Sequence, residues 1–200
     1  NAGAWLVMTV GILSLQGAYA LHGEILRSMD VSLKYVRYPK DLENYDSLII
    51  PGGESTTISK LLDESGLRQA VLDFAKQRSI LGTCAGMILM AKDADDDKVN
   101  PLRLIDMKVS RNAYGRQVDS FTTNLEMSLN GSTVSTKGVF IRAPRIISFG
   151  QDLEILAKVN DEPVLVKQGL HMASSFHPEL SGNNNVHRYF LSLNRKPVST

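Results

Sequence analysis

Strand-like and helix-like segments alternate through the first half of this 200-residue chain, and this order restricts the folds that it can adopt. Apolar or alternating segments typical of strands lie at residues 10–15, 32–37, 47–50 and 79–83. Apolar residues with helical spacing occur at residues 18–29, 57–64, 67–76 and 85–91. This alternation predicts an α/β fold, in which a mostly parallel sheet is flanked by helices on both faces.

The second half of the chain has a different pattern, in which strands predominate from residue 107 to residue 175. Turn signals at Asn130-Gly131 and Asn160-Asp161 divide this region. We expect some of its strands to extend the main sheet and others to form a smaller antiparallel section. A helical pattern returns at residues 186–193 and predicts a closing helix.

The composition indicates one hydrophobic core. With 43% hydrophobic residues, the chain can bury a core of good size, and no repeat or linker divides it. We therefore expect a single domain over residues 8–200. We also expect Met8 to be the natural start and residues 1–7 to be an appended extension, because the apolar residues before Met8 lack the basic start of a signal peptide.

Charge and cysteine content exclude several classes of protein. The formal net charge of +1 gives no electrostatic case for nucleic acid. No apolar stretch reaches the roughly 20 residues needed to span a bilayer. A single cysteine cannot form an internal disulfide, which permits a reducing compartment. We expect a cytoplasmic enzyme without a nucleic-acid or membrane partner, and we expect the acidic residues at 93–97 to form a solvated loop rather than a metal site.

The only cysteine, Cys84, lies in Gly82-Thr83-Cys84-Ala85-Gly86, directly after an apolar strand. A Gly-x-nucleophile-x-Gly sequence between a strand and a helix is the pattern of a nucleophile elbow. Glycines let the strand and the helix cross closely, and the helix start presents free N–H groups to whatever Cys84 attacks. The helix end and a nearby imidazolium would favour the thiolate. The alternative is a buried structural cysteine.

A second motif, Phe176-His177-Pro178-Glu179-Leu180, could supply the base that a cysteine nucleophile needs. In an extended segment, His177 and Glu179 would point to the same side, with Pro178 stiffening the link and preventing a helix. Glu179 would then orient His177. The other three histidines are scattered, and we expect each to be structural or on the surface; they are His22, His171 and His187.

A third motif, at residues 51–57, runs from a buried strand into Gly52-Gly53 and a helix start. Backbone N–H groups in such a turn can bind an anion, and one could form half of an oxyanion hole. The missing Gly-Lys-Ser/Thr ending makes a phosphate loop the weaker alternative. Parallel strands place their active sites beyond their carboxyl ends, so we expect Gly52-Gly53, Cys84 and the His177 segment to meet there.

These motifs together resemble the class I, triad-type glutamine amidotransferases. They resemble most closely the branch of that family that serves pyridoxal 5′-phosphate synthase as its glutaminase subunit. The resemblance covers the chain from about Thr9 to Asn194. The stretches that carry it are GILSLQG (11–17), PGGESTT (51–57), GTCAG (82–86), RNAYGRQVDSF (111–121), VFIRAP (139–144) and FHPEL (176–180). The stretches at 111–121 and 139–144 are specific to the vitamin B6 branch.

The resemblance implies the reaction, the partner and the residues of the site. The reaction is hydrolysis of L-glutamine to L-glutamate and ammonia, without metal or cofactor, and the ammonia passes to a separate synthase subunit. The implied catalytic residues are Cys84, His177 and Glu179, with Gly53 and Ala85 as oxyanion donors. The implied glutamine site consists of Gly52, Gly53, Glu54, Arg111, Ile141 and Arg142.

The sequence departs from the family pattern in two places. Residues 92–104 are divergent, and Leu21-His22 replaces the common acidic-His pair. Three alternatives remain open: a glutaminase subunit of another enzyme, such as imidazole glycerol phosphate synthase, a cysteine peptidase, and a non-enzymatic sensor with a reactive Cys84. The intact His177-x-Glu179 motif disfavours the sensor.

Overall fold

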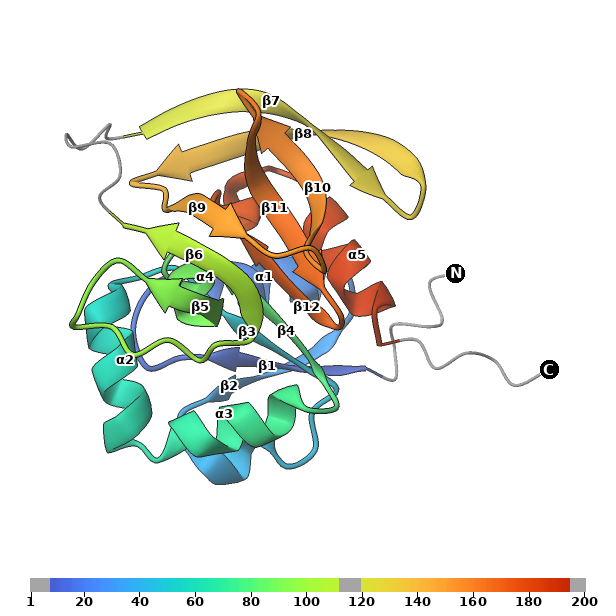
Figure 1. The fold of residues 1–200 in the computed structure, drawn as a ribbon. Helices are drawn as coiled ribbons and strands as arrows, with labels where there is room; N and C mark the ends of the chain where they lie inside the picture. Colours follow the sequence, from blue (N-terminus) through green and yellow to red (C-terminus); the bar gives the residue numbers. More distant parts are fainter. Residues whose placement is uncertain (1–7, 112–119, 195–200) are drawn as a thin grey trace.

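The main sheet of the protein has seven strands. The computed structural model describes residues 8–111 and 120–194. The sheet order is β10-β11-β12-β4-β3-β1-β2 (Figure 1). The strands span Thr9–Leu13 (β1), Ser32–Val36 (β2), Ser47–Ile50 (β3), Ser79–Thr83 (β4), Glu154–Val159 (β10), Glu162–Gln168 (β11) and His171–Ser174 (β12). The five strands from β12 to β2 are parallel, whereas β10, β11 and β12 pair antiparallel, so the predicted, mostly parallel sheet is confirmed.

Helices cover both faces of this sheet because neighbouring residues of each buried strand point to opposite sides. Ile50 and Ile80 pack in the cluster on one face, and Ile49 and Leu81 pack in the cluster on the other. The first face is covered by α2 (Ser55–Glu64), α3 (Leu67–Ala75) and α4 (Ala85–Met90), and the second by α1 (Tyr19–Ser28) and α5 (Asn185–Ser192). A short 3-10 helix, η2, spans Pro39–Leu42. Among the described helices, none is long and apolar enough to cross a membrane.

Two smaller sheets lie beside the main one (Figure 1). One contains β5 (Ala91–Ala94), β6 (Ile105–Ser110) and β9 (Arg145–Phe149), with β6 and β9 antiparallel. The other is an antiparallel hairpin of β7 (Ser120–Leu129) and β8 (Ser132–Ile141). Asn130 and Gly131 form its turn with φ angles of 52° and 76°, which matches the left-handed geometry that tight hairpins need.

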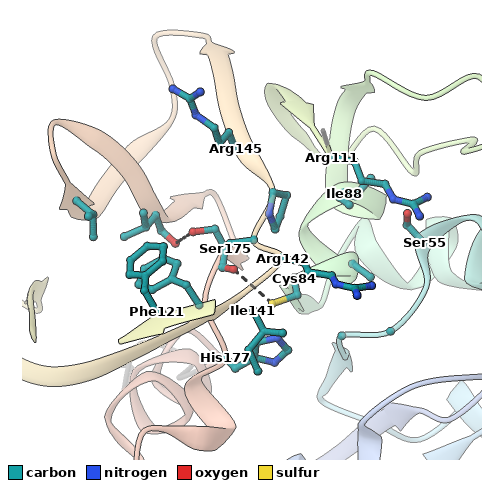
Figure 2. A pocket seen from close by; sticks show the side chains of 18 of the residues that line it. Ser55, Cys84, Ile88, Arg111, Phe121, Ile141, Arg142, Arg145, Ser175 and His177 are labelled. Atoms are coloured by element: carbon teal, nitrogen blue, oxygen red, sulfur yellow. Dashed lines mark hydrogen bonds between the residues drawn. The ribbon is translucent and has the colours of Figure 1, made fainter. Parts of the chain in front are cut away.

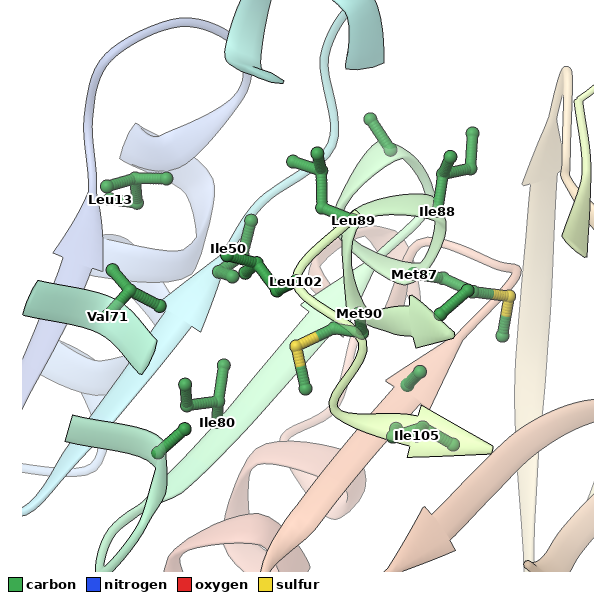
Figure 3. Packing of buried hydrophobic residues seen from close by; sticks show 14 of the residues in the cluster. Leu13, Ile50, Val71, Ile80, Met87, Ile88, Leu89, Met90, Leu102 and Ile105 are labelled. Atoms are coloured by element: carbon green, nitrogen blue, oxygen red, sulfur yellow. The ribbon is translucent and has the colours of Figure 1, made fainter. Parts of the chain in front are cut away.

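The helix after Cys84 is enclosed in the core. All six residues of α4 are buried, although it is the shortest α-helix described. Figure 3 shows Met87, Leu89 and Met90 projecting from α4 among apolar side chains such as Leu102 and Ile105. This packing holds the amino end of α4, and with it the residue that begins the helix, in a fixed position.

Candidate active site

The three predicted motifs meet beyond the carboxyl ends of adjacent parallel strands. Gly52-Gly53 follows β3, Cys84 follows β4, and His177 lies three residues beyond the end of β12. A Cβ atom built on Gly52 would lie 3.0 Å from Cε1 of His177 and 3.4 Å from Cβ of Cys84. Gly52 therefore touches both side chains, and the three segments form one site.

Cys84 occupies a strained turn between β4 and α4. Its backbone has φ 53° and ψ −107°, a conformation that residues other than glycine rarely adopt. The turn is tight because a Cβ on Gly82 would lie 2.4 Å from the carbonyl oxygen of Gly86, and one on Gly86 would lie 2.0 Å from that of Ile50. The glycines thus permit the close crossing that a nucleophile elbow requires.

The Cys84 thiol is protonated and directed at a backbone carbonyl. Its side chain is nearly buried, and Sγ donates a hydrogen bond to the carbonyl oxygen of Ser175 at 3.3 Å (Figure 2). Burial, and secondarily the Glu179 carboxylate, raise the pKa of the Cys84 thiol well above its usual value. The expected bias of the helix end toward thiolate is therefore outweighed in this arrangement.

His177 and Glu179 form a close pair. Nδ1 of His177 lies 2.5 Å from Oε1 of Glu179, whose side chain is fully buried. The backbone N–H of His177 also donates to the Val139 carbonyl at 2.8 Å, which ties the pair to β8. The local backbone differs from the expected extended segment: Pro178 begins a 3-10 helix, η3 (Pro178–Leu180), because proline is tolerated at the first position of a helix.

A buried histidine that we expected to be structural or on the surface also touches this pair. His22 of α1 has no exposed surface, and its Nε2 lies 3.4 Å from Oε2 of Glu179. Its Nδ1 lies 2.8 Å from Nε2 of His187, which is buried on α5. The sequence carries a signal that points to His22: it falls at i, i+4 and i+7 spacing with Leu26 and Met29, on the apolar side of α1.

A pocket of about 800 Å³ opens at this site (Figure 2). It is lined by every residue expected to act in catalysis or to bind substrate or oxyanion, except Glu179, which lies behind His177. These lining residues are Gly52, Gly53, Glu54, Cys84, Ala85, Arg111, Ile141, Arg142 and His177. The pocket is therefore bounded by a thiol, an imidazole and three guanidinium groups, since Arg145 also lines it. This set is suited to a substrate that carries a carboxylate and an acyl carbon.

Glu54 joins the pocket to the start of α2. Its carboxylate accepts hydrogen bonds from the backbone N–H groups of Thr56 and Thr57, which explains why α2 begins at Ser55, two residues earlier than predicted. Burial opposes ionisation of Glu54, but the hydrogen bonds from Thr57 and Thr56 outweigh it and lower the pKa of the carboxyl to about 2. Glu54 is therefore an anion at neutral pH.

Arg111 connects Glu54 to the divergent segment. Its Nη1 lies 3.0 Å from Oε1 of Glu54 and 3.3 Å from Oδ2 of Asp96. Asp96 belongs to the acidic run that we expected to form a solvated loop. That expectation is wrong in part, because Asp93 lies in β5 and the Asp96 carboxylate contacts a pocket residue. The rest of the motif that begins at Arg111, residues 112–119, lies outside the described residues.

The comparisons with known proteins agree on one family. Residues 12–196 match the SNO glutamine amidotransferase family. The chain is 46% identical to pyridoxal 5′-phosphate synthase subunit PdxT of Francisella philomiragia, over 93% of this chain and 99% of that protein. It is 41% identical to the protein of the same name in Francisella tularensis subsp. novicida, over 94% of this chain and all of that one.

Solved structures are consistent with this family. A crystal structure described as a glutamine amidotransferase has a TM-score of 0.86 and 44% identity, covering 92% of this chain and 98% of that one. The structure of PurLQS from Thermotoga maritima has a TM-score of 0.69 at 15% identity, covering 94% of this chain and 99% of that one, and supports the fold alone. The chain belongs to the SNO glutamine amidotransferase family.

Proposed function

We propose that this chain is a glutaminase that hydrolyses the side-chain amide of L-glutamine to L-glutamate and ammonia. The observation that carries the proposal is the placement of Cys84 on a strained turn, in one pocket with His177, which is paired with Glu179 at 2.5 Å. A thiol, a base and a group that orients the base are the parts that acyl transfer through a cysteine requires. Membership of a glutamine amidotransferase family identifies the acyl donor as glutamine.

The reaction proceeds through an acyl-enzyme. His177 accepts the thiol proton as Cys84 Sγ attacks the amide carbon, and the electron pair of the C=O bond moves to its oxygen. The tetrahedral intermediate collapses when His177 gives the proton to the amide nitrogen, so ammonia leaves and a thioester remains. Water then attacks the thioester while His177 takes its proton; the C–S bond breaks, and the proton returns to Cys84. Glu179 orients His177 and stabilises its positive charge in both steps.

The remaining pocket residues bind the substrate and the oxyanion. The backbone N–H groups of Gly53 and Ala85 are the proposed oxyanion donors, and loss of one such donor typically costs about 3 kcal/mol of transition-state stabilisation. Arg111 and Arg142 suit the α-carboxylate of glutamine, because a guanidinium matches a carboxylate fork. The anionic Glu54 suits the α-ammonium group, and Gly52 and Ile141 complete the wall.

The ammonia is supplied to a separate synthase subunit for pyridoxal 5′-phosphate synthesis, and the two proteins act together in the cytoplasm. The relatives at 46% and 41% identity carry the name of that synthase's subunit, and they align over almost the whole of this chain. The same relatives favour this assignment over a glutaminase subunit of imidazole glycerol phosphate synthase. The proposal includes a single glutamine amidotransferase domain over residues 8–200, which the family match over residues 12–196 supports.

A glutaminase assay with and without the cognate synthase subunit tests the proposal. We expect glutamate to form from glutamine in the mixture, and the two proteins to elute together on size exclusion. An equimolar mixture that releases no glutamate would contradict the activity. A different result would be a mixture that hydrolyses glutamine but shows no co-elution and no transfer of labelled amide nitrogen into pyridoxal 5′-phosphate. That result would contradict the assigned partner but not the glutaminase activity.

A further inference from the structure

The second carboxylate oxygen of Glu179 is buried and faces a buried histidine. Oε1 is held by His177, while Oε2 has no geometrically good hydrogen bond among the described residues. The polar group that faces it is Nε2 of His22 at 3.4 Å, and neither side chain has any exposed surface. A buried carboxylate oxygen that lacks a hydrogen-bond donor lowers the free energy of unfolding, and the carboxylate can then rotate. The contact with His22 therefore determines the orientation of the Glu179 carboxylate.

His22 is neutral and can carry its proton on the nitrogen that faces Glu179. Burial, followed by the charges of His187 and His177, lowers the pKa of His22 well below its usual value. Its Nδ1 lies 2.8 Å from Nε2 of His187, and Nδ1 of His187 has no described partner. If His187 donates from Nε2, then His22 must accept at Nδ1 and hold its proton at Nε2.

These contacts form one chain of polar groups, and the histidine tautomers set its direction. It runs from His187 to His22, then to Glu179 and His177, and it crosses from α5 to α1 and on to η3. The Thr83 hydroxyl lies 3.3 Å from Nε2 of His22 and is the other polar group on that nitrogen. The titratable groups that face His22 are therefore Glu179, His187 and His177.

We propose that His22 is a positioning residue of this active site: its Nε2–H holds Oε2 of Glu179, so that Oε1 stays aligned on Nδ1 of His177. His187 sets the required tautomer by donating to Nδ1 of His22. The inference rests on the proposed glutaminase function, because it assigns His22 a part in that reaction without contact with glutamine. The simpler reading, a polar pair that only fills space between α1 and α5, predicts different kinetics.

A pair of polar variants separates the two roles. His22→Gln can place its amide nitrogen where Nε2 lies, whereas His22→Asn reaches only the position of Nδ1 and cannot contact Glu179. We expect His22→Asn to lower kcat for glutamine, measured with the cognate synthase subunit, on the order of tenfold. The KM should stay within about twofold, because glutamine is not touched. His22→Gln should retain most of the wild-type kcat.

A double-mutant cycle shows whether His22 acts through Glu179. In a Glu179→Ala background the carboxylate is absent, so His22→Asn should cause no further loss of kcat. The control is His171→Gln, which alters a histidine at the opposite end of β12 that contacts the backbone of Ala75 and Ile80. It should leave kcat unchanged whatever it does to the melting temperature.

The outcomes are distinguishable. An inactive wild-type mixture would overturn the proposed function. If the wild type is active and His22→Asn has the same kcat, the positioning role is overturned. It is also overturned if His22→Asn lowers kcat by the same factor in the Glu179→Ala background as in the wild type. Should His22→Asn fail to fold, His22→Gln carries the test alone: a folded Gln variant as impaired as Glu179→Ala would contradict the proposal.

Discussion

Sγ of Cys84 donates a hydrogen bond to the carbonyl oxygen of Ser175 at 3.3 Å, although His177 lies in the same pocket. The thiol is therefore held in its protonated form by the residue that follows β12. Burial and the Glu179 carboxylate both oppose its ionisation. The proton must move to His177 when glutamine binds, and the following expectations depend on that transfer.

Replacement of Cys84 by serine should abolish glutamine hydrolysis, with kcat reduced by at least about a thousandfold. The change in volume is small, but an alcohol is far harder to ionise than a thiol beside a single imidazole. Glutamate release is measured with the purified variant and the cognate synthase subunit. Co-elution with that subunit and the melting temperature should stay close to wild type, and full ammonia release would remove Cys84 from the mechanism.

His177→Asn should be as damaging as the loss of Cys84, because residues that act as one unit do not contribute additively. Glu179→Gln should leave more residual activity, since the amide can still accept a hydrogen bond from His177. Both are compared at saturating glutamine. Near-wild-type turnover by His177→Asn would mean that another residue is the base. If Glu179→Gln were less active than His177→Asn, the expected order of residual activities would be wrong.

Glutaminase activity should depend on the synthase subunit. The carbonyl oxygen of Gly52 accepts a hydrogen bond from Ala18 N–H at 3.0 Å, which fixes the Gly52–Gly53 peptide and the direction of the Gly53 N–H. Rotation of this peptide would break that bond and present the N–H differently to the oxyanion. The Gln16-Gly17 and Gly52-Gly53 loops face the open end of the sheet. A partner bound there could favour one of the two orientations of the Gly52–Gly53 peptide over the other.

The measurement compares glutamine turnover by the isolated chain with turnover at saturating synthase subunit. We expect at least about a tenfold increase, which corresponds to roughly 1.4 kcal/mol of activation free energy. An unrelated protein at the same concentration serves as control. Equal rates in both conditions would contradict the switch and leave the assignment of Cys84 and His177 intact.

Arg111→Ala should raise the KM for glutamine about tenfold or more, with kcat changed by less than about threefold, because a carboxylate contact made equally in substrate and transition state affects binding alone. The matched control is Arg27→Ala, which removes an arginine of α1 whose side chain donates to the hydroxyl of Tyr35 on β2. A fall in kcat at unchanged KM would instead place Arg111 in the chemical step.

Acid should destabilise the fold through His187. Burial lowers the pKa of this residue from 6.5 to about 4, so between these values the unfolded chain binds a proton that the folded chain excludes. The free energy of unfolding should therefore fall as pH falls through this range, and the contribution from His187 between pH 7.5 and pH 5 is about 2 kcal/mol. Denaturant unfolding at both pH values, for wild type and His187→Gln, measures it. Equal pH dependence in the two proteins would contradict the assignment.

Local patterns were sufficient for the main-sheet strands and the α-helices of residues 9–90 and for the three motifs. The strand predictions at 47–50 and 79–83 match β3 and β4 to the residue, because both are short, wholly buried apolar runs that end in turn residues. Gly-x-Cys-x-Gly predicted a tight strand-to-helix turn, and the structure has one, since Gly82 is needed for close approach to the carbonyl of Gly86, four residues along the chain. Such features depend on neighbours along the chain, which a sequence displays directly.

The contacts that orient the site depend on residues far apart in the chain. His22, Glu179 and His187 lie on three different elements, and no local pattern could reveal that α1 and α5 bring two histidines against a carboxylate. Asp96 reaches Arg111 for the same reason. The sequence alone therefore determined the α/β order and which motifs carry reactive groups, because these follow from side-chain periodicity and backbone sterics. Only the tertiary structure decided the direction of the Cys84 thiol and the partners of Glu179, because both are set by how the sheet and its helices pack.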